Sequence, residues 1–180
     1  MSRSVQDCQR ELYVIAQLLG YPDEAWHAGL PELAQVASEL EDGDAYHAVR
    51  ALLDEALVTD RIDFESRYVD AFDFGKTTSL HLTSRGRDDV SQQRASLLAY
   101  SMYFKESGFD AGEETPDYLP ALVELASAVD PAEAALVLGG CRADLTLLIQ
   151  ALDEAGLTAY AGLARRVMTI AREIEQEVAA

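Results

Sequence analysis

Cysteine, histidine and basic residues are all scarce in this sequence, and each shortage narrows what the chain is able to do. The 180 residues include two Cys, three His, and 14 Lys and Arg against 32 Asp and Glu, so the formal net charge is −18. A general nucleic-acid binder needs clustered Lys and Arg to neutralise phosphates, which argues against that class. An acidic surface favours solubility and, where there is a partner, a basic one.

Metal and redox sites have little support. Cys8 and Cys141 form no Cys-x-x-Cys pair and have no nearby His, which predicts small buried side chains. Asp44 and His47 form an unmatched acid–histidine pair, whereas a di-iron bundle requires two Glu-x-x-His pairs and further carboxylates. We therefore predict neither a metal nor a cofactor.

Membrane and catalytic motifs are also missing. No uncharged apolar run approaches the roughly 20 residues that span a bilayer, and Asp7 and Glu11 interrupt the N-terminal apolar pattern, which has no cleavage site. We therefore expect a cytoplasmic protein without membrane insertion. His-Glu-x-x-His, Gly-x-Ser-x-Gly and phosphate-loop motifs do not occur, so the sequence favours a protein that is not an enzyme.

Apolar residues recur at helical spacing along nearly the whole chain, and turn residues separate the runs. The first run starts at Val5 and is ended by Gly20 and Pro22. Further helices are predicted from Pro31 to near Gly43, Asp44 to Leu57, Asp60 to Phe72, Asp88 or Asp89 to Gly108, from a cap at Asp117, and over about 131–155 and 157–178.

Two details of these helices are expectations for the structure to test. The helix that ends at Gly108 is expected to bury a stripe of Val90, Leu97, Leu98, Ser101 and Phe104. Gly139 and Gly140 are expected to break or kink the helix that contains them, because each Gly costs about 1 kcal/mol relative to Ala in a helix interior.

The predicted fold class is all-α. No alternating strand segment occurs, and a chain of 180 residues with 49% hydrophobic residues is long enough for one substantial core. We expect a single domain over residues 1–180, a helical bundle of about seven to nine helices with two long functional loops near residues 74–88 and 108–116. Basic residues (Lys76, Arg85, Arg87 and Arg94) collect around the first loop, where they either solvate it or serve a function.

Two segments are more specific than the composition. They read YVDAFDFGKTTSLHL, from Tyr68 to Leu82, and ETPDYLP, from Glu114 to Pro120. This pairing resembles the nitrate reductase delta-subunit family, the NarJ-type molybdenum-enzyme assembly chaperones, which are related to the TorD-type chaperones. The stretch LLGYPDEAW, from Leu18 to Trp26, also looks like the opening helix and turn of that family. The resemblance covers roughly residues 10–125.

The resemblance implies an all-helical cytoplasmic chaperone specific to one enzyme system. Such a protein binds the apo catalytic subunit of a respiratory molybdenum oxidoreductase, here with nitrate reductase as the first candidate, through its N-terminal leader or leader remnant and assists insertion of the molybdenum cofactor. Tyr118 stands where many relatives carry His, and TSRGRDD follows SLHL where many nitrate reductase chaperones have an acidic, histidine-containing stretch. These departures leave open which molybdenum enzyme is served.

The two segments are the predicted partner-binding site. Leu80 and Leu82 alternate with polar residues as an extended stretch does, and we expect them to line a groove for an amphipathic segment. Purely structural roles are equally good explanations for some of these residues. The aromatic residues would then pack in the core, and Asp117 would only cap a helix. The complete set is Tyr68, Phe72, Asp73, Ser79, Leu80, His81, Leu82, Pro116, Asp117 and Tyr118.

Two other functions remain as alternatives. A helical scaffold subunit of a permanent complex would need a large apolar face, which the stripe from Leu157 to Val178 would supply unless it packs on the core of the domain itself. A small enzyme or nucleotide-binding protein has only the abundance of carboxylates in its favour. For the chaperone we expect a monomer or weak dimer.

Overall fold

A computed structural model describes residues 4–40, 43–75, 77–84, 90–110, 112 and 114–180. The described part confirms the all-α class: it holds eight α-helices and one 3₁₀ turn, η1 (Leu82–Ser84). The first four helices are α1 (Val5–Leu19), α2 (Glu24–Ser38), α3 (Asp44–Val58) and α4 (Arg61–Phe72). The other four are α5 (Val90–Ser107), α6 (Leu119–Ala128), α7 (Pro131–Glu154) and α8 (Thr158–Val178).

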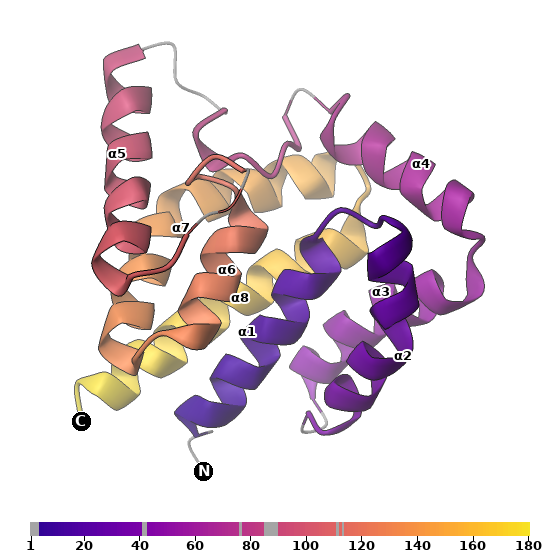
Figure 1. Cartoon of the computed structure of the whole chain (residues 1–180), viewed down its shortest axis with the longest axis horizontal. Coiled ribbons are helices and arrows are strands. Elements are labelled where there is room, and N and C mark those ends of the chain that lie inside the picture. Colours follow the sequence, from indigo (N-terminus) through magenta and orange to yellow (C-terminus); the bar gives the residue numbers. More distant parts are fainter. Residues whose placement is uncertain (1–3, 41–42, 76, 85–89, 111, 113) are drawn as a thin grey trace.

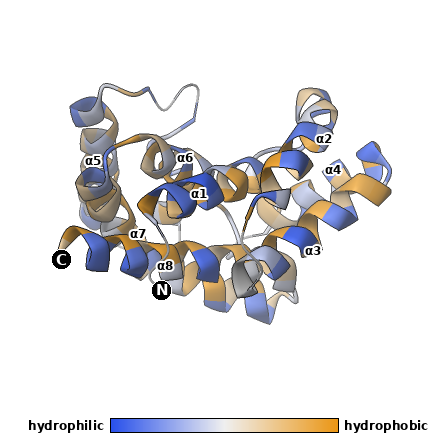
Figure 2. Cartoon of the chain, turned by 90° about the horizontal axis from the view of Figure 1, so that it is seen from below, coloured by the Kyte–Doolittle hydropathy of each residue, from blue (hydrophilic) through white to orange (hydrophobic). Residues whose placement is uncertain are grey.

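Helices α1 and α8 form the centre of the bundle. They contact each other, α1 packs on α6, and α8 packs on α7 and α3. Figure 1 shows α5, α6 and α7 on one side of this centre and α2, α3 and α4 on the other, and the turned view in Figure 2 agrees. The core is built from fully buried side chains such as Leu12, Ile15, Val167 and Ile170, whose spacing places them on one face of each helix.

The C-terminal apolar stripe, which lies on α8, could either form a free apolar face or pack on the core of the domain. Tyr160, Ala164, Val167 and Ile174 are buried within the bundle, whereas Val178 near the end is exposed. The stripe therefore packs on the core of this chain, and it does not supply the free apolar face that a scaffold subunit requires.

The predicted helix start at Asp60 is confirmed, whereas the one at Pro31 is not. Asp60 caps α4 by accepting a hydrogen bond from the backbone N–H of Ile62 at 2.9 Å. The predicted start at Pro31 is wrong, because α2 begins at Glu24 and is capped by Asp23, which accepts from the N–H of Trp26 at 2.7 Å. Pro31 lies inside the helix, where it removes one backbone hydrogen bond. The predicted start at Asp88 or Asp89 lies outside the described residues.

The expected buried stripe of α5 is correct only at Phe104. Val90 and Leu98 are exposed, and the buried residues of this helix are Tyr100 and Phe104. The helix lies at the edge of the bundle and packs on α7 and η1 (Figure 1). Because apolar residues occur on more than one side of α5, periodicity could not identify the inward face.

Helix α7 runs without a break through Gly139 and Gly140, so the break expected there does not occur. Gly140 packs against Tyr103 of α5, where an added Cβ atom would lie 2.4 Å from the Tyr103 hydroxyl oxygen. In the described part of the chain, α7 is also the one helix long and apolar enough to cross a membrane by length and composition. In this fold it packs against α6 and α8, and it buries residues such as Leu145 and Leu148.

Candidate functional site

The two predicted loop segments lie side by side. His81 and Tyr118 form an isolated antiparallel bridge. The N–H of Leu82 donates to the carbonyl oxygen of Asp117 at 3.0 Å, and the N–H of Leu119 donates to that of Leu80 at 2.9 Å. These backbone bonds fasten the loop after α4 to the start of α6.

Asp117 is the polar centre of this junction and is 2% exposed. Its carboxylate accepts hydrogen bonds from the N–H of Thr83 at 3.0 Å, the hydroxyl of Thr83 at 2.6 Å and the hydroxyl of Thr115 at 2.5 Å. Burial alone would raise the pKa of Asp117, but its hydrogen bonds to His81, Thr115 and Thr83 outweigh burial and hold the pKa well below its usual range. The expected role of Asp117 as a helix cap is wrong, because Tyr118 occupies the cap position of α6 and makes no side-chain cap bond.

His81 completes the junction. Its Nδ1 atom lies 3.0 Å from the hydroxyl oxygen of Thr115 and 3.5 Å from a carboxylate oxygen of Asp117, and its Nε2 atom lies 3.9 Å from Glu114. The hydrogen bond to Asp117 raises the pKa of His81, partial burial opposes that rise, and the charges of Asp117 and Glu114 add to it. Protonated His81 therefore holds the two loops together more strongly than neutral His81 does.

Tyr68 and Phe72, the two aromatic residues of the first segment that were predicted for the site, belong to the core. The hydroxyl of Tyr68 donates to the carbonyl oxygen of Leu19 at 2.8 Å and lies 3.3 Å from the hydroxyl oxygen of Tyr118. The Phe72 ring packs against Tyr68 and Tyr160, with centroids 4.7 Å and 4.8 Å apart. Burial raises the pKa of Tyr68, so its hydroxyl stays protonated.

The remaining predicted residues have mixed surroundings. Leu80 and Leu82 are buried in the core instead of lining an open groove, which corrects the geometry expected for them. Asp73 is exposed at the C-terminal end of α4, and Pro116 is half-buried. Half-buried Ser79 accepts a hydrogen bond from the N–H of His81 at 3.2 Å. A direct role of these residues in partner binding stays a prediction.

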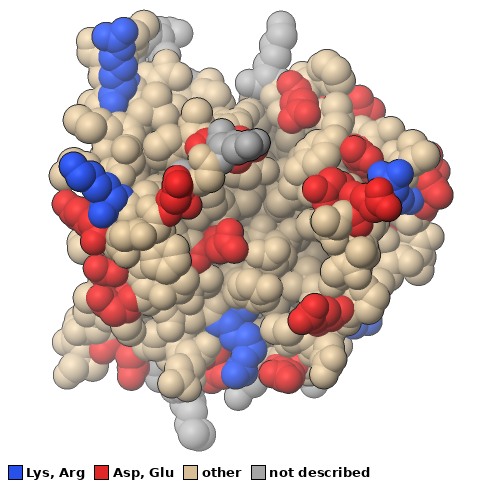
Figure 3. Space-filling view, viewed as in Figure 1, with Lys and Arg blue, Asp and Glu red and all other residues tan. Residues whose placement is uncertain are grey.

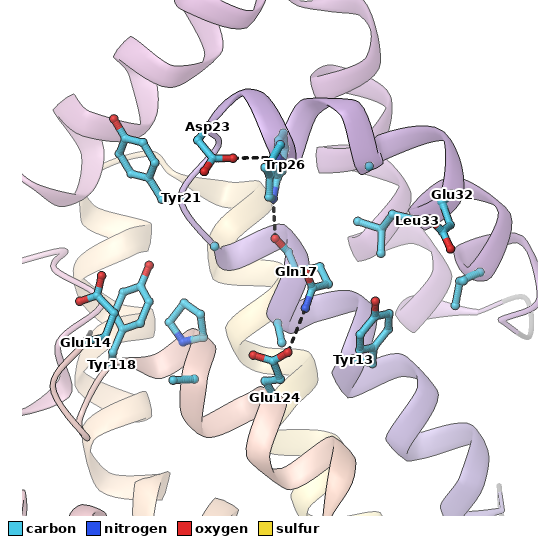
Figure 4. Close-up of a pocket in the computed structure, with 17 residues that line it drawn as sticks. Tyr13, Gln17, Tyr21, Asp23, Trp26, Glu32, Leu33, Glu114, Tyr118 and Glu124 are labelled. Atoms are coloured by element: carbon cyan, nitrogen blue, oxygen red, sulfur yellow. Dashed lines mark hydrogen bonds between the residues drawn. The ribbon is translucent and has the colours of Figure 1, made fainter. Parts of the chain in front are cut away.

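A groove of about 610 Å³ opens beside the junction, between α1, α2 and α6. Tyr118 is the one predicted site residue that lines it. Figure 4 shows Tyr118, Tyr21 and Glu114 on one side of the groove, Tyr13, Glu32 and Leu33 on the other, and Gln17 between them. The further lining residues are Ala16, Gly20, Asp23, Ala25, Trp26, Gly29, Val36, Pro120, Ala121 and Glu124.

The groove walls are held by contacts between helices. The indole N–H of Trp26 donates to the carbonyl oxygen of Gln17 at 2.6 Å, and its ring stacks on Phe64 with centroids 5.3 Å apart. The side-chain amide of Gln17 in turn donates to Glu124 of α6 at 3.5 Å. The stretch Leu18–Trp26, which resembles the family opening, could have identified this wall, because Trp26 and Tyr21 come from it.

The lining of the groove is acidic and aromatic. Its charged members are Asp23, Glu32, Glu114 and Glu124, and none of its lining residues is Lys or Arg. Figure 3 shows the same face of the molecule, hollowed between its two halves, with acidic side chains around the hollow. Aromatic walls beside carboxylates fit a ligand that is both apolar and cationic.

An all-helical bundle with an acidic, aromatic-lined groove is one arrangement in which a helical segment of a partner can be bound. No protein-family model matches the chain. It is 30% identical to the probable nitrate reductase molybdenum cofactor assembly chaperone NarJ of Bacillus subtilis over 125 residues, which cover 69% of this chain and 68% of that protein. The chain therefore belongs to the family of NarJ-type nitrate reductase molybdenum cofactor assembly chaperones, which confirms the resemblance.

Two further relatives agree with this assignment. The chain is 30% identical over 147 residues to the nitrate reductase molybdenum cofactor assembly chaperone NarJ of Escherichia coli, covering 80% of this chain and 62% of that protein. It is 32% identical over 117 residues to the nitrate reductase-like protein NarX of Mycobacterium tuberculosis, covering 64% of this chain and 18% of that protein. The matched region thus spans less than two thirds of either relative.

Proposed function

We propose that this protein is a cytoplasmic assembly chaperone for the catalytic subunit of a molybdenum oxidoreductase, with nitrate reductase as the first candidate. Membership in the NarJ-type family supports this function, because the relatives from Bacillus subtilis and Escherichia coli are named for it. In this role the protein holds the client before cofactor insertion and catalyses no reaction of its own.

The groove between α1, α2 and α6 is the proposed client site, and its lining is the observation that carries the proposal. Four carboxylates and four aromatic rings line it, without a single Lys or Arg. An N-terminal segment of the client with basic and apolar residues would place its apolar side chains against Trp26 and Tyr118 and its cations near the carboxylates. A short helix laid in a groove is a common way to bind such a segment.

The test is calorimetric titration of the purified chain with a peptide that carries the N-terminal segment of the catalytic subunit from the same genome. We expect saturable binding that weakens as salt rises, because the attraction between the acidic lining and a basic peptide is screened. Glu32→Lys and Glu124→Lys should each weaken binding several-fold, because both glutamates line the groove. Glu177→Lys, at the exposed end of α8, is the matched control for the change in net charge.

Three results would contradict parts of this proposal. Equal affinity for the Glu32, Glu124 and Glu177 variants would show that overall charge, and not the groove, attracts the peptide. A salt-independent affinity would remove the electrostatic part of the proposal. Absence of any binding would place the client contact elsewhere on the catalytic subunit.

Affinity capture from the native host, grown under anaerobic respiratory conditions, tests the wider function. The tagged protein should recover a catalytic subunit that lacks its cofactor, and less of it when Glu32 and Glu124 are both changed to Lys. Leu80 and Leu82 are poor positions for this test, because both are buried and a charged substitution would unfold the junction. Recovery of fully assembled, cofactor-loaded enzyme would instead indicate a permanent subunit.

A further inference from the structure

Helix α5 is apolar on two opposite sides. Its inner side is anchored by Tyr100, whose hydroxyl donates to the buried Asp144 of α7 at 2.5 Å, and by the buried ring of Phe104. Its outer side carries Leu98, which is 64% exposed, and exposed Met102 one turn further on. A helix with apolar residues on both sides normally has both sides covered.

Small residues surround the exposed apolar pair. Ala95, Ala99 and Ser101 are exposed on the same helix, next to Leu98 and Met102. Short side chains at these positions let a second helix approach closely, because interaxial distances depend on the side chains at the contact. The outer side of α5 therefore has the shape of a helix-packing surface.

We propose that two copies of this chain associate through the outer face of α5, with the two helices antiparallel. Two observations carry this proposal. Leu98 and Met102 are exposed, and a cation precedes this pair in the helix while an anion follows it. Arg94 lies four residues before Leu98, and Glu106 lies four residues after Met102.

This spacing is self-complementary. When two α5 helices pack antiparallel with the centre of the contact at the level of Tyr100, Leu98 of each copy faces Met102 of the other. The same register brings Arg94 of each copy opposite Glu106 of the other, so two ion pairs flank the apolar contact. A two-fold symmetric interface requires this kind of self-complementarity.

Charge favours this surface over the rest of the molecule as a contact between copies. The whole chain has a net charge of −18, whereas the charged residues of α5 are Arg94, Lys105 and Glu106. Two α5 faces therefore meet without local repulsion, but the acidic bodies behind them repel each other over a longer range. The dimer should be weak at low salt and should strengthen as salt screens that repulsion.

The dimer would leave the client groove open, because no residue that lines the groove belongs to α5. A contact through one helix face is small compared with the roughly 1,200–2,000 Å² of stable complexes, so association at high micromolar concentration is expected. This proposal is independent of the chaperone function. The effect of salt has the opposite sign for the two processes, since added salt weakens binding of a basic peptide and strengthens the dimer.

Sedimentation equilibrium of the full chain, over a range of protein and salt concentrations, tests the proposal. We expect a monomer–dimer equilibrium that Leu98→Glu weakens by about tenfold or more, because each carboxylate would be buried against an apolar side chain. Ile62→Glu on α4 is the matched control, because Ile62 is 63% exposed and lies outside the proposed interface. That variant should dimerise like the parent protein.

Charge reversal tests the register. Arg94→Glu and Glu106→Arg should each weaken the dimer, and the double variant should restore it, because the exchanged charges again face each other. A chain that stays monomeric at all concentrations and salt levels would overturn the proposal. A dimer insensitive to Leu98→Glu, or a double variant without restoration, would overturn the interface or its register. Dissociation by the client peptide would show instead that α5 of one copy enters the groove of another.

Discussion

Asp117 decides how the two loops are joined. It accepts hydrogen bonds from the backbone and the hydroxyl of Thr83, a residue 34 positions away in the sequence. Because the carboxylate is buried, removing it leaves the N–H and the hydroxyl of Thr83 without the acceptor that they have in the folded chain. The Asp117 side chain therefore supports the backbone bonds that join the two loops, next to Tyr118 beside the groove.

Asp117→Ala should destabilise the protein by an amount that reflects these buried donors, on the order of 1–3 kcal/mol for each one left unpaired. Urea unfolding followed by circular dichroism measures the loss. Asp130→Ala is the matched control, because Asp130 accepts two backbone hydrogen bonds as the exposed cap of α7. That cap should be worth only about 1 kcal/mol. Equal losses for the two variants would contradict the central role of Asp117.

The raised pKa of His81 predicts how the stability of the protein depends on pH. Its pKa is raised in the folded state, mainly by Asp117, so its contribution to stability is complete below the unfolded value of about 6.5 and is lost as pH rises through the folded value. Thermal unfolding temperatures should therefore fall as pH increases from about 6 to 8. His81→Gln should flatten this part of the profile, and His47→Gln, on the exposed surface of α3, should leave it unchanged. Parallel profiles for all three proteins would contradict the assignment.

The depressed pKa of Asp117 affects the stability of the protein in acid. A carboxylate whose folded pKa lies below its unfolded value stabilises the protein above about pH 4 and loses that contribution as pH falls through the folded pKa. Acid unfolding should therefore begin at higher pH when Asp117 is replaced by Asn. The amide keeps the size of the side chain but cannot supply the anionic acceptor, so the shift reports on charge and not on volume.

At the scale of helices, α5 and α7 meet where Gly140 lies under Tyr103. Gly139 is next to it in the same helix, and an added Cβ there would lie 3.4 Å from its nearest neighbour, a carboxylate oxygen of Glu175. The two glycines therefore have the same helix propensity but different surroundings.

Gly139→Ala should stabilise the protein by up to about 1 kcal/mol, the usual gain of Ala over Gly in a helix. Gly140→Ala should be the less stable variant, because its Cβ forces the Tyr103 ring away from α7. Thermal unfolding of both variants measures the difference. The difference should disappear when Tyr103 is also changed to Ala, and its persistence would show that Tyr103 is not the cause.

Helix boundaries were predictable where a cap or breaker lies in the adjacent sequence, as at Asp60 and Gly20. They were not predictable where packing overrides a local signal. Pro31 is tolerated inside α2, and Gly139 with Gly140 inside α7, because the bundle supports both helices along their length. The inward face of α5 was also ambiguous, because its outer side carries apolar residues as well.

Across the whole molecule, a buried ion-pair network connects the first helix to the last. Glu11 of α1 is fully buried, and its carboxylate accepts hydrogen bonds from the guanidinium of Arg166 of α8 at 2.6 Å and 3.0 Å. Glu173 pairs with the same guanidinium at 3.2 Å. These contacts fix how the N-terminal helix sits on α8, and thus one wall of the groove, because α1 supplies Tyr13 and Gln17 to it.

Arg166→Ala should cost about 3–5 kcal/mol, because it removes the guanidinium that pairs with the buried carboxylate of Glu11. Arg142→Ala is the control, since Arg142 also bridges two helices by pairing with Glu175 at 2.5 Å, but on the surface. That exposed pair should contribute at most about 1 kcal/mol. Chemical denaturation separates the two cases, and a small loss for Arg166→Ala would mean that water reaches Glu11.

The all-α class, most of the eight described helices and the family could be predicted from the sequence, because periodicity, caps and the two segments around SLHL and ETPDYLP are local properties. The placement of the site could not. Leu80 and Leu82 alternate with polar residues, yet both are buried, because backbone bonds to the start of α6 draw the loop onto the core. The groove takes its walls from α1, α2 and α6, which are distant in the chain, and only long-range packing brings Trp26, Glu124 and Tyr118 to one surface.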